Sequence, residues 1–420
     1  MDELETANRE PSKSPSRGVR ILLMSFAYGP GSGSEPGNCW AWSLAASTIA
    51  NVDVITTTRY RDDIDAVLSS LGTDSLQVHY VDPPRFARRG GLLHLLSYRA
   101  WKGVAAKKLY ALHALEPYDI VHHLSYGNVW FTPIGGELGV PFVVGPLNGG
   151  PRVPLSLYPL LGLRGGLRES ARLVFRLVRS LDPRVRRAWS RADVVVAANH
   201  ETIELLSRDK RQRARLQTNS ITTTSLTQWR EERRPDANSD VAEVVPKSLL
   251  AAGRLLPWKG FALALYALKE LPDWRLTVVG GGPDERRIER LSARLGVTDR
   301  LTRVRWLPQG ELWELMMRSQ VVLVPSLRDD GPCLLTEALV LGRPVVALDQ
   351  GLARNLKGRL GVSTVSPTSP RRTARRVAHS VNSAPHRATV ELDDLVWENL
   401  PKLQAAIYAE AVSAPRCFSG

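Results

Sequence analysis

Cysteine and long apolar segments are both scarce in this 420-residue sequence. The three cysteines, Cys39, Cys333 and Cys417, are scattered and odd in number, which excludes a disulfide framework and favours a reducing, cytosolic compartment. No uninterrupted apolar run approaches the ~18 residues that a membrane span needs, so we expect no integral membrane segment. Residues 1–18 are polar and lack the apolar core of a signal peptide, and we expect them to form a disordered tail.

Negative charge is also in deficit. The sequence has 42 Asp and Glu against 56 Lys and Arg, a net charge of +14, and a pI near 10.0. Such a balance favours polyanionic surroundings, namely nucleic acid, phosphate ligands or anionic lipid. Nucleic acid is not expected, because no RNP-like, zinc-finger or helix-turn-helix pattern occurs and the basic stretches have few interleaved aromatics.

The basic residues gather in two stretches, 83–112 and 164–191. In the second stretch four arginines recur every fourth residue, which predicts one helix face: Arg164, Arg168, Arg172 and Arg176. A basic amphipathic helix suits an anionic membrane surface, so a peripheral position on the inner face of the membrane is one expectation. A solvated arginine face over an ordinary core contact is the alternative.

Short buried strands alternate with helical patterns twice along the chain, which predicts an α/β protein with parallel sheets. We expect two doubly wound domains with a ligand cleft at the carboxyl edges of their strands. The predicted layout has the tail at 1–18, a first domain at 19–220, a linker at 221–247, a second domain at 248–390, an amphipathic helix at 391–413 and a tail at 414–420.

A glycine loop follows the first predicted strand, and residues 28–40 read YGPGSGSEPGNCW. A strand, a glycine loop and a helix in that order form a phosphate-binding turn, and the glycines mimic part of a dinucleotide fingerprint. An NAD-dependent oxidoreductase is therefore one hypothesis. The next strand, DVITTT, ends in threonines and Arg59 instead of the acid that would bind a ribose, which disfavours it.

Three later stretches carry residues suited to a phosphorylated sugar. In GRLLPWKG, residues 253–260, Arg254 and Lys259 flank a turn and suit a diphosphate, although two solvated cations are the alternative. In VVGGGPDERRIERL, residues 278–291, the glycines permit close approach of a ligand or form a plain tight turn.

The third stretch, PSLRDDGPCLLTEALVLGRPVV at 325–346, places Asp329 after a strand and Glu337 eight residues later in a helix. Such carboxylates can accept hydrogen bonds from sugar hydroxyls, and the start of the helix can face a phosphate. An acid favoured by the helix dipole is the alternative for Glu337.

Taken in order, these stretches resemble the donor half of glycosyltransferase family 4, whose pattern is G-R-x4-K-G, a glycine-rich turn, then E-x7-E leading into E-A-x3-G-x-P-V-V. The first half resembles a subgroup of that family with G-S-E-P-G, D-x-V-H-H and G-P-x-x-G-G, matched here at residues 33–37, 119–123 and 145–150. The resemblance spans roughly residues 19–412. It implies the GT-B fold, with two Rossmann-like domains facing a central cleft, and a last helix that crosses back to the first domain.

The activity that the resemblance implies is a retaining hexosyltransferase reaction (EC 2.4). The donor is a nucleotide diphosphate sugar, and the acceptor is lipid-linked, a polysaccharide or another glycan. No cofactor is implied, since the sugar nucleotide is a co-substrate, and no metal ion is implied either. An Asp-x-Asp at Asp63–Asp65 opens a predicted helix, where acids are favoured anyway.

The resemblance also implies roles for single residues. Arg254 and Lys259 neutralise the leaving diphosphate, Asp329 holds sugar hydroxyls, and Glu337 binds the ribose. His122 is expected to face the cleft as a catalytic residue, with His123 on the opposite strand face, and a buried, satisfied histidine is the alternative. The other residues implied to bind substrate are Gly33, Ser34, Glu35, Gly37, His123, Asn148, Gly149, Gly281, Gly331, Pro332, Cys333 and Leu334.

Two departures from the family pattern support a third hypothesis. Pro332 lacks a backbone N–H where donor contacts are expected, and Gly351 stands alone where the family usually has two glycines. A protein that binds sugar nucleotides with reduced or lost catalysis would fit these changes.

Overall fold

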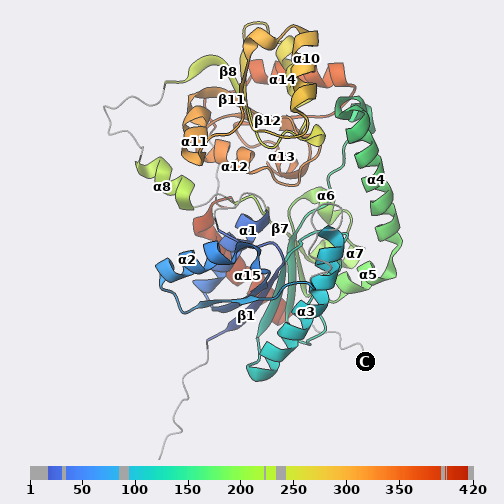
Figure 1. Cartoon of the computed structure of the whole chain (residues 1–420), viewed down its shortest axis with the longest axis vertical. Coiled ribbons are helices and arrows are strands. Elements are labelled where there is room, and N and C mark those ends of the chain that lie inside the picture. Colours follow the sequence, from blue (N-terminus) through green and yellow to red (C-terminus); the bar gives the residue numbers. More distant parts are fainter. Residues whose placement is uncertain are drawn as a thin grey trace, which may run out of the picture.

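A computed structural model of the chain describes residues 18–30, 35–84, 94–221, 224–232, 243–388, 393 and 395–414. Two α/β domains lie one above the other, the first below and the second above in the view of Figure 1. Each contains one parallel sheet with helices packed against it. The α/β class predicted from the alternation of strands and helices is confirmed.

The sheet of the first domain has seven strands in the order β3-β2-β1-β4-β5-β6-β7, all parallel. Its strands are β1 (Arg20–Ser25), β2 (Asn51–Thr56), β3 (Leu76–Tyr80), β4 (Ile120–Ser125), β5 (Phe142–Leu147), β6 (Val194–Ala197) and β7 (Ala214–Leu216). The helices of this part of the chain are α1 (Glu35–Ser47), η1 (Thr58–Tyr60), α2 (Arg61–Leu71), α3 (His94–Leu115), η4 (Leu155–Leu161), α4 (Gly162–Leu181), α5 (Pro183–Ser190), α6 (His200–Ile203) and α7 (Arg208–Arg213).

The second sheet has six parallel strands in the order β10-β9-β8-β11-β12-β13. Its strands are β8 (Val245–Ala252), β9 (Arg275–Val279), β10 (Leu301–Val304), β11 (Ser319–Val324), β12 (Val345–Leu348) and β13 (Val362–Val365). The helices of the second half are α8 (Thr224–Glu232), η5 (Pro257–Lys259), α9 (Phe261–Lys269), α10 (Glu285–Leu295), η6 (Thr298–Arg300), α11 (Gln309–Arg318), α12 (Cys333–Val340), α13 (Gly351–Asn355), α14 (Pro370–Asn382), η7 (Trp397–Asn399) and α15 (Leu400–Ser413).

The central strands are buried and mainly apolar because helices cover both of their faces. In β1, Ile21 and Leu23 belong to the hydrophobic cluster that includes α1 and α15, whereas Leu22 and Met24 belong to the cluster that includes α3. The second sheet likewise separates two buried clusters. This burial fixes the strand register, so the ends of the strands hold their loops in defined places.

The last helix belongs structurally to the first domain. Within α15, Ile407, Tyr408 and Ala411 are buried in the same cluster as β1 and α1. Part of the predicted linker is helical, since α8 spans Thr224–Glu232, and β8 begins at Val245. The chain thus returns to the first domain after completing the second.

One segment that the sequence places in the first domain packs in the core of the second. Val153, Leu157, Leu160 and Leu161, in and just before η4, are buried among residues of β8, α9 and α14. The Arg287 guanidinium of the second domain donates to the carbonyl oxygen of Leu160 at 2.8 Å. The predicted domain limits did not anticipate this crossing.

The helix that follows η4 returns to the first domain. Two turns after its start, Glu169 pairs with Arg328 of the second domain at 3.0 Å. Near its end, Arg176 donates to the carbonyl oxygens of Gly150 and Pro151 at 2.9 and 3.0 Å. In Figure 1, α4 runs along one side of the molecule past both domains. It therefore forms a strut that contacts both domains.

The arginine row of α4 does not form one exposed face, so that prediction is wrong. Arg164 and Arg168 are exposed, Arg172 is half-buried and Arg176 is only 4% exposed. The reason is geometric: four residues of an α-helix turn by about 400°, so the row drifts by about 40° at each step and winds into the protein.

Candidate active site

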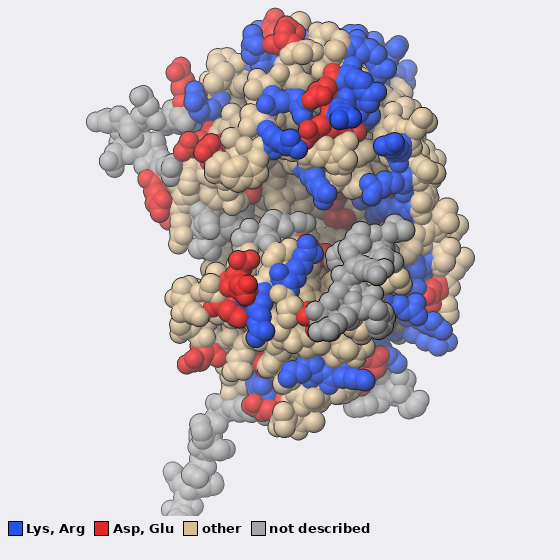
Figure 2. All heavy atoms as spheres, viewed as in Figure 1, with Lys and Arg blue, Asp and Glu red and all other residues tan. Residues whose placement is uncertain are grey.

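A cleft of about 910 Å³ lies between the two domains. Its walls come from loops at the carboxyl ends of the strands, next to β1 and β4 in the first sheet and β8 and β11 in the second. In both sheets these are the neighbouring strands at which the strand order reverses, where ligands of doubly wound folds bind. The space-filling view shows the surface hollowed between the domains (Figure 2).

Both predicted cations line the cleft. Arg254 follows β8, is exposed, and has no ion-pair partner among the described residues. Lys259 ends η5, and its ammonium nitrogen lies 2.5 Å from the Asp329 carboxylate. The loop carrying Arg254 packs tightly, because a Cβ at Gly280 would lie 2.0 Å from the carbonyl oxygen of Gly253. A glycine at position 280 thus permits the approach of the two turns.

Three carboxylates of the second domain face the same cleft. Asp329 also accepts a hydrogen bond from the Ser326 hydroxyl at 3.1 Å, so Lys259 and Ser326 fix its position. Glu337 lies in α12, where burial raises the pKa of its carboxyl. Burial likewise raises the pKa of the Asp330 carboxyl, which the sequence reasoning did not single out.

The start of α12 forms part of the wall through the predicted residues Gly331, Pro332, Cys333 and Leu334. Pro332 caps the helix and its carbonyl oxygen accepts from the amide of Leu335 at 3.0 Å. The missing N–H of the proline therefore lies outside the first helical turn, whose leading amides at Cys333 and Leu334 remain. Burial raises the pKa of the Cys333 thiol to about 11, so the side chain is a neutral thiol at pH 7.

The first domain contributes Glu35, the first residue of α1. Its Oε1 atom accepts from the Ser125 hydroxyl at 3.1 Å and from the Gly127 amide at 3.2 Å, both next to the end of β4. Burial raises the pKa of the Glu35 carboxyl to about 7. Asn148, another predicted residue, lines the cleft as well. Gly33 and Ser34 lie outside the described residues.

The prediction that His122 faces the cleft is wrong. His122 is 0% exposed, and its Nε2 donates to the carbonyl oxygen of Gly145 at 2.9 Å. Its Nδ1 lies 3.0 Å from the Tyr408 hydroxyl of α15, and the Trp42 ring covers another side. Burial lowers the pKa of His122 to about 4, so the ring is neutral at pH 7. The returning helix thus seals this strand face.

His123 points to the other face of β4, as the alternation of strand side chains requires. It is 1% exposed, its Nε2 lies 3.2 Å from the Tyr98 hydroxyl, and its Nδ1 accepts from the Ile134 amide. Neither histidine belongs to the described lining of the cleft. Among the other predicted residues, Gly37, Gly149 and Gly281 do not belong to the described lining of the cleft.

Asp330 joins the two domains at one end of the cleft. Its Oδ1 atom accepts from the Gly149 amide at 2.7 Å and from the Asn199 side-chain amide at 3.1 Å, both in the first domain. Gly149 therefore acts through its backbone amide, which binds Asp330 in the loop that also carries Asp329. In the sequence, Asp330 is notable only for its position beside Asp329. That position does not show whether its side chain contacts the other domain or faces solvent.

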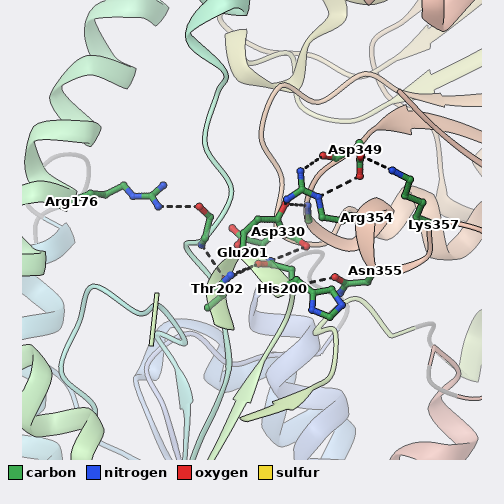
Figure 3. Close-up of polar contacts among 12 residues, drawn as sticks. Arg176, His200, Glu201, Thr202, Asp330, Asp349, Arg354, Asn355 and Lys357 are labelled. Atoms are coloured by element: carbon green, nitrogen blue, oxygen red, sulfur yellow. Dashed lines mark hydrogen bonds and ion pairs between the residues drawn. The ribbon is translucent and has the colours of Figure 1, made fainter. Parts of the chain in front are cut away.

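A second set of contacts extends this bridge, as Figure 3 shows. Glu201 of the first domain accepts from the Gly351 amide at 2.9 Å and lies 3.2 Å from the Arg354 guanidinium. Arg354 and Lys357 in turn flank Asp349 at 3.3 and 3.0 Å. Gly351 has φ +53°, and a Cβ there would lie 2.0 Å from the carbonyl oxygen of Asp329. The single glycine thus occupies a position that a side chain would disrupt.

The predicted Asp-x-Asp lies on α2, away from the residues that line the cleft. Asp65 pairs there with Arg61 at 3.4 Å and accepts from Tyr80. Within the part of the chain that the structure describes, no group of three or more His, Cys, Asp or Glu side chains is placed to hold a metal ion.

Solved structures of other proteins share the arrangement of the two domains. Solved structures with the same overall arrangement include a sucrose-phosphate synthase from Thermosynechococcus elongatus, at TM-score 0.59 and 17% identity over 94% of this chain and 100% of that one. Anabaena Alr3699/HepE in complex with UDP-glucose matches at TM-score 0.54 and 16% identity, over 93% of this chain and 99% of that one. The fold is GT-B.

The sequence comparisons each cover only part of the chain. Residues 234–388 match the family model described as glycosyl transferases group 1. A 2-deoxystreptamine glucosyltransferase from Streptomyces kanamyceticus is 34% identical over 103 residues, which are 24% of this chain and 27% of that protein. The matches span between 12% and 36% of the length of the curated relatives.

Proposed function

We propose that this protein is a glycosyltransferase that moves a sugar from a nucleotide diphosphate sugar to a hydroxyl of a lipid-linked, polysaccharide or other glycan acceptor. The observation that carries the proposal is the convergence of Arg254, Lys259, Asp329 and Glu337 on one interdomain cleft. The match to the glycosyl transferases group 1 model includes all four. We further propose a retaining, hexosyltransferase-type reaction.

The chemistry follows from the charges in the second domain. As the bond between sugar and diphosphate breaks, negative charge grows on the departing phosphate, and two cations beside it stabilise it most strongly at that point. Arg254 and Lys259 supply this charge without a metal ion in the proposed reaction. Asp329, held by Lys259 and Ser326, accepts hydrogen bonds from the donor sugar, while Glu337 accepts from the ribose.

Donor binding should be measurable before any acceptor is known. In a thermal-shift panel of nucleotide diphosphate sugars at about 100 times their Kd, the preferred donor is expected to stabilise the folded chain by about 2.7 kcal/mol through mass action. Lys259→Ala should lose more of that shift than Arg254→Ala, because Lys259 also holds Asp329. NAD serves as the control ligand, and a shift with NAD but with no nucleotide sugar would contradict the proposed function.

We also propose that the protein binds peripherally to the inner, cytoplasmic face of an anionic membrane through α4. Six large apolar side chains on this helix are 60–97% exposed, namely Leu163, Leu167, Val174, Leu177, Val178 and Leu181. The usual arrangement of an amphipathic helix is therefore reversed in α4. Charged Glu169 and Arg176 are buried, and an apolar stripe faces outward. Arg164, Arg168, Arg184 and Arg187 are exposed near the stripe, and each such cation contributes about 1 kcal/mol at an anionic surface.

No described helix has the length and apolar character to cross a bilayer. Of the other basic stretch, residues 85–93 lie outside the described residues, and Lys102 is half-buried against Thr132. The stripe on α4 thus supports the membrane proposal better than residues 83–112 do.

A vesicle-binding experiment tests this surface. The full chain is expected to sediment with phosphatidylglycerol-containing vesicles at low salt, and Leu167→Ser with Leu177→Ser should reduce binding at least tenfold, because each buried leucine contributes about 1.5–3 kcal/mol. Leu115→Ser, which changes an exposed leucine on α3, is the matched control. Equal binding of both variants would contradict docking through α4.

A further inference from the structure

The two walls of the cleft differ in charge. The second domain supplies both lining cations, Arg254 and Lys259. Among the described residues that line the cleft from the first domain there is no lysine or arginine, and Glu35 is the charged group. A phosphate or carboxylate would therefore be attracted to the second domain, and the described residues that line the opposite wall offer it no cation.

Two aromatic rings form an apolar part of the first-domain wall. Tyr126 and Phe131 both line the cleft, with ring centroids 6.3 Å apart. Tyr126 packs further against Phe26 and Tyr98, at 5.3 and 5.0 Å between centroids, so its ring is held in place. Fixed aromatic rings beside a few convergent polar groups are typical of small-molecule sites, and the C–H face of a sugar ring is apolar enough to pack on them.

Side-chain amides supply the neutral polar part of this wall. Asn38, Asn128, Asn148 and Asn219 line the cleft. The Oδ1 atoms of Asn148 and Asn219 are buried and have no hydrogen-bond partner among the described residues. An amide both donates and accepts, as a sugar hydroxyl does, so these groups match neighbouring hydroxyls better than they match an anion.

Glu35 is oriented by the protein and keeps one oxygen for a ligand. Both protein hydrogen bonds, from Ser125 and Gly127, fall on Oε1. Oε2 has no donor among the described residues, while the side chain lines the cleft. Burial in the wall, with Asp330 nearby, raises the pKa of Glu35 to about 7, so near neutral pH the carboxyl can either donate to or accept from a hydroxyl.

We propose that the acceptor group that reacts is an uncharged sugar ring, bound on Tyr126, Phe131 and the asparagines, with Glu35 hydrogen-bonded to its hydroxyls. This inference rests on the proposed function and narrows it. Sugars that carry a phosphate or a carboxylate on the reacting ring are excluded, because the wall offers them a carboxyl group where they need a cation.

The test uses the full chain and the donor that gives the largest thermal shift. Methyl hexosides are compared with their 6-phosphates and with the corresponding methyl uronides, and two quantities are measured. Ligand-observed NMR reports binding of each sugar, and acceptor-dependent release of the nucleoside diphosphate reports transfer. We expect the neutral sugar to be favoured at least tenfold in both, because an unmatched anion opposite a carboxyl loses the hydrogen bonds that the neutral ring makes.

Glu35→Gln keeps the shape of the side chain and removes its ability to ionise. We expect it to raise the KM of the neutral acceptor roughly tenfold while the KM and the thermal shift of the donor stay unchanged, which also demonstrates that the variant is folded. Asp63→Asn on α2, an exposed acid outside the cleft, is the control and should change neither KM.

The outcomes separate the two claims. Equal or better use of the phosphorylated or uronic sugars, or an unchanged acceptor KM in Glu35→Gln, overturns the inference. Binding of none of the sugars, with the donor still stabilising the chain, overturns it too but leaves the proposed function standing. If no nucleotide sugar stabilises the chain, the proposed function fails and the inference fails with it.

Discussion

Replacing Arg254 with alanine is expected to reduce sugar transfer by roughly 10²–10³-fold, by analogy with the loss of one oxyanion-stabilising donor in other enzymes. The guanidinium lies at the end of β8, lines the cleft and is committed to no ion pair among the described residues. Its charge is therefore available to the diphosphate. The effect should fall mainly on kcat, because the negative charge that it stabilises grows during bond cleavage.

Lys259→Ala should cost a similar factor, with one difference. The lysine also holds Asp329 at 2.5 Å, so its loss leaves that carboxylate without its cation and disturbs binding of the donor sugar as well. We therefore expect a larger increase in donor KM for Lys259→Ala than for Arg254→Ala. Lys269→Ala, at the exposed end of α9, is the matched control for loss of a cation from the same domain.

Steady-state kinetics with the preferred donor measure these effects, and circular dichroism checks that the variants are folded. Turnover by Arg254→Ala within a factor of two of the unmodified chain would contradict the assignment of the diphosphate site to this loop.

The second large effect is expected from a residue outside the cleft. Leu157→Ala should lower the free energy of unfolding by about 2–5 kcal/mol, the usual range for removing a fully buried leucine. Leu157 is 0% exposed and lies in η4, inside the core of the second domain. Its truncation leaves a cavity where η4 packs in that core.

A control is available two residues away. Leu155, also in η4, is 74% exposed, and Leu155→Ala should change the stability by less than about 0.5 kcal/mol. Urea denaturation gives the size of both effects, and hydrogen exchange locates them. We expect Leu157→Ala to speed exchange in β8 and α9, and loss of protection confined to the first sheet would contradict the packing of η4 in the second domain.

Much of the fold follows from local pattern. The central strands are short and mainly apolar, because helices bury both of their faces, and the alternation of such runs with amphipathic segments predicts a doubly wound sheet. The cleft residues Arg254 and Asp329 were identified for a related reason. Each comes shortly after a buried strand, and in a parallel sheet those ends meet at one edge. Glu35, by contrast, was implied only by the family resemblance of residues 33–37.

The features that the sequence did not predict depend on contacts between segments far apart in the chain. The sequence around His122 could not reveal that Tyr408, 286 residues later, lies against the imidazole and closes that strand face. Similarly, the residues around Leu157 do not show whether it packs in the core of the first domain or in the core of the second. Asp330 is a third case, since its partners Gly149 and Asn199 are 181 and 131 residues away.

The prediction that the arginines of α4 share one helix face was wrong for a different reason. A repeat of four residues was read as one face, although the true helical period is 3.6 and the row winds inward by its fourth member. The apolar residues of the same helix were the better signal. They could not be assigned to the outside from sequence, because an apolar stripe is ordinarily buried.

The central claim is that this cleft transfers a sugar with retention, and the most direct measurement is a proton NMR spectrum of the transfer product. The purified chain is incubated with its preferred nucleotide sugar and a neutral acceptor, and the coupling constant of the new anomeric proton is compared with that of the donor. We expect the product to keep the donor's anomeric configuration. A product of inverted configuration, or none from any donor that stabilises the chain, would contradict the account.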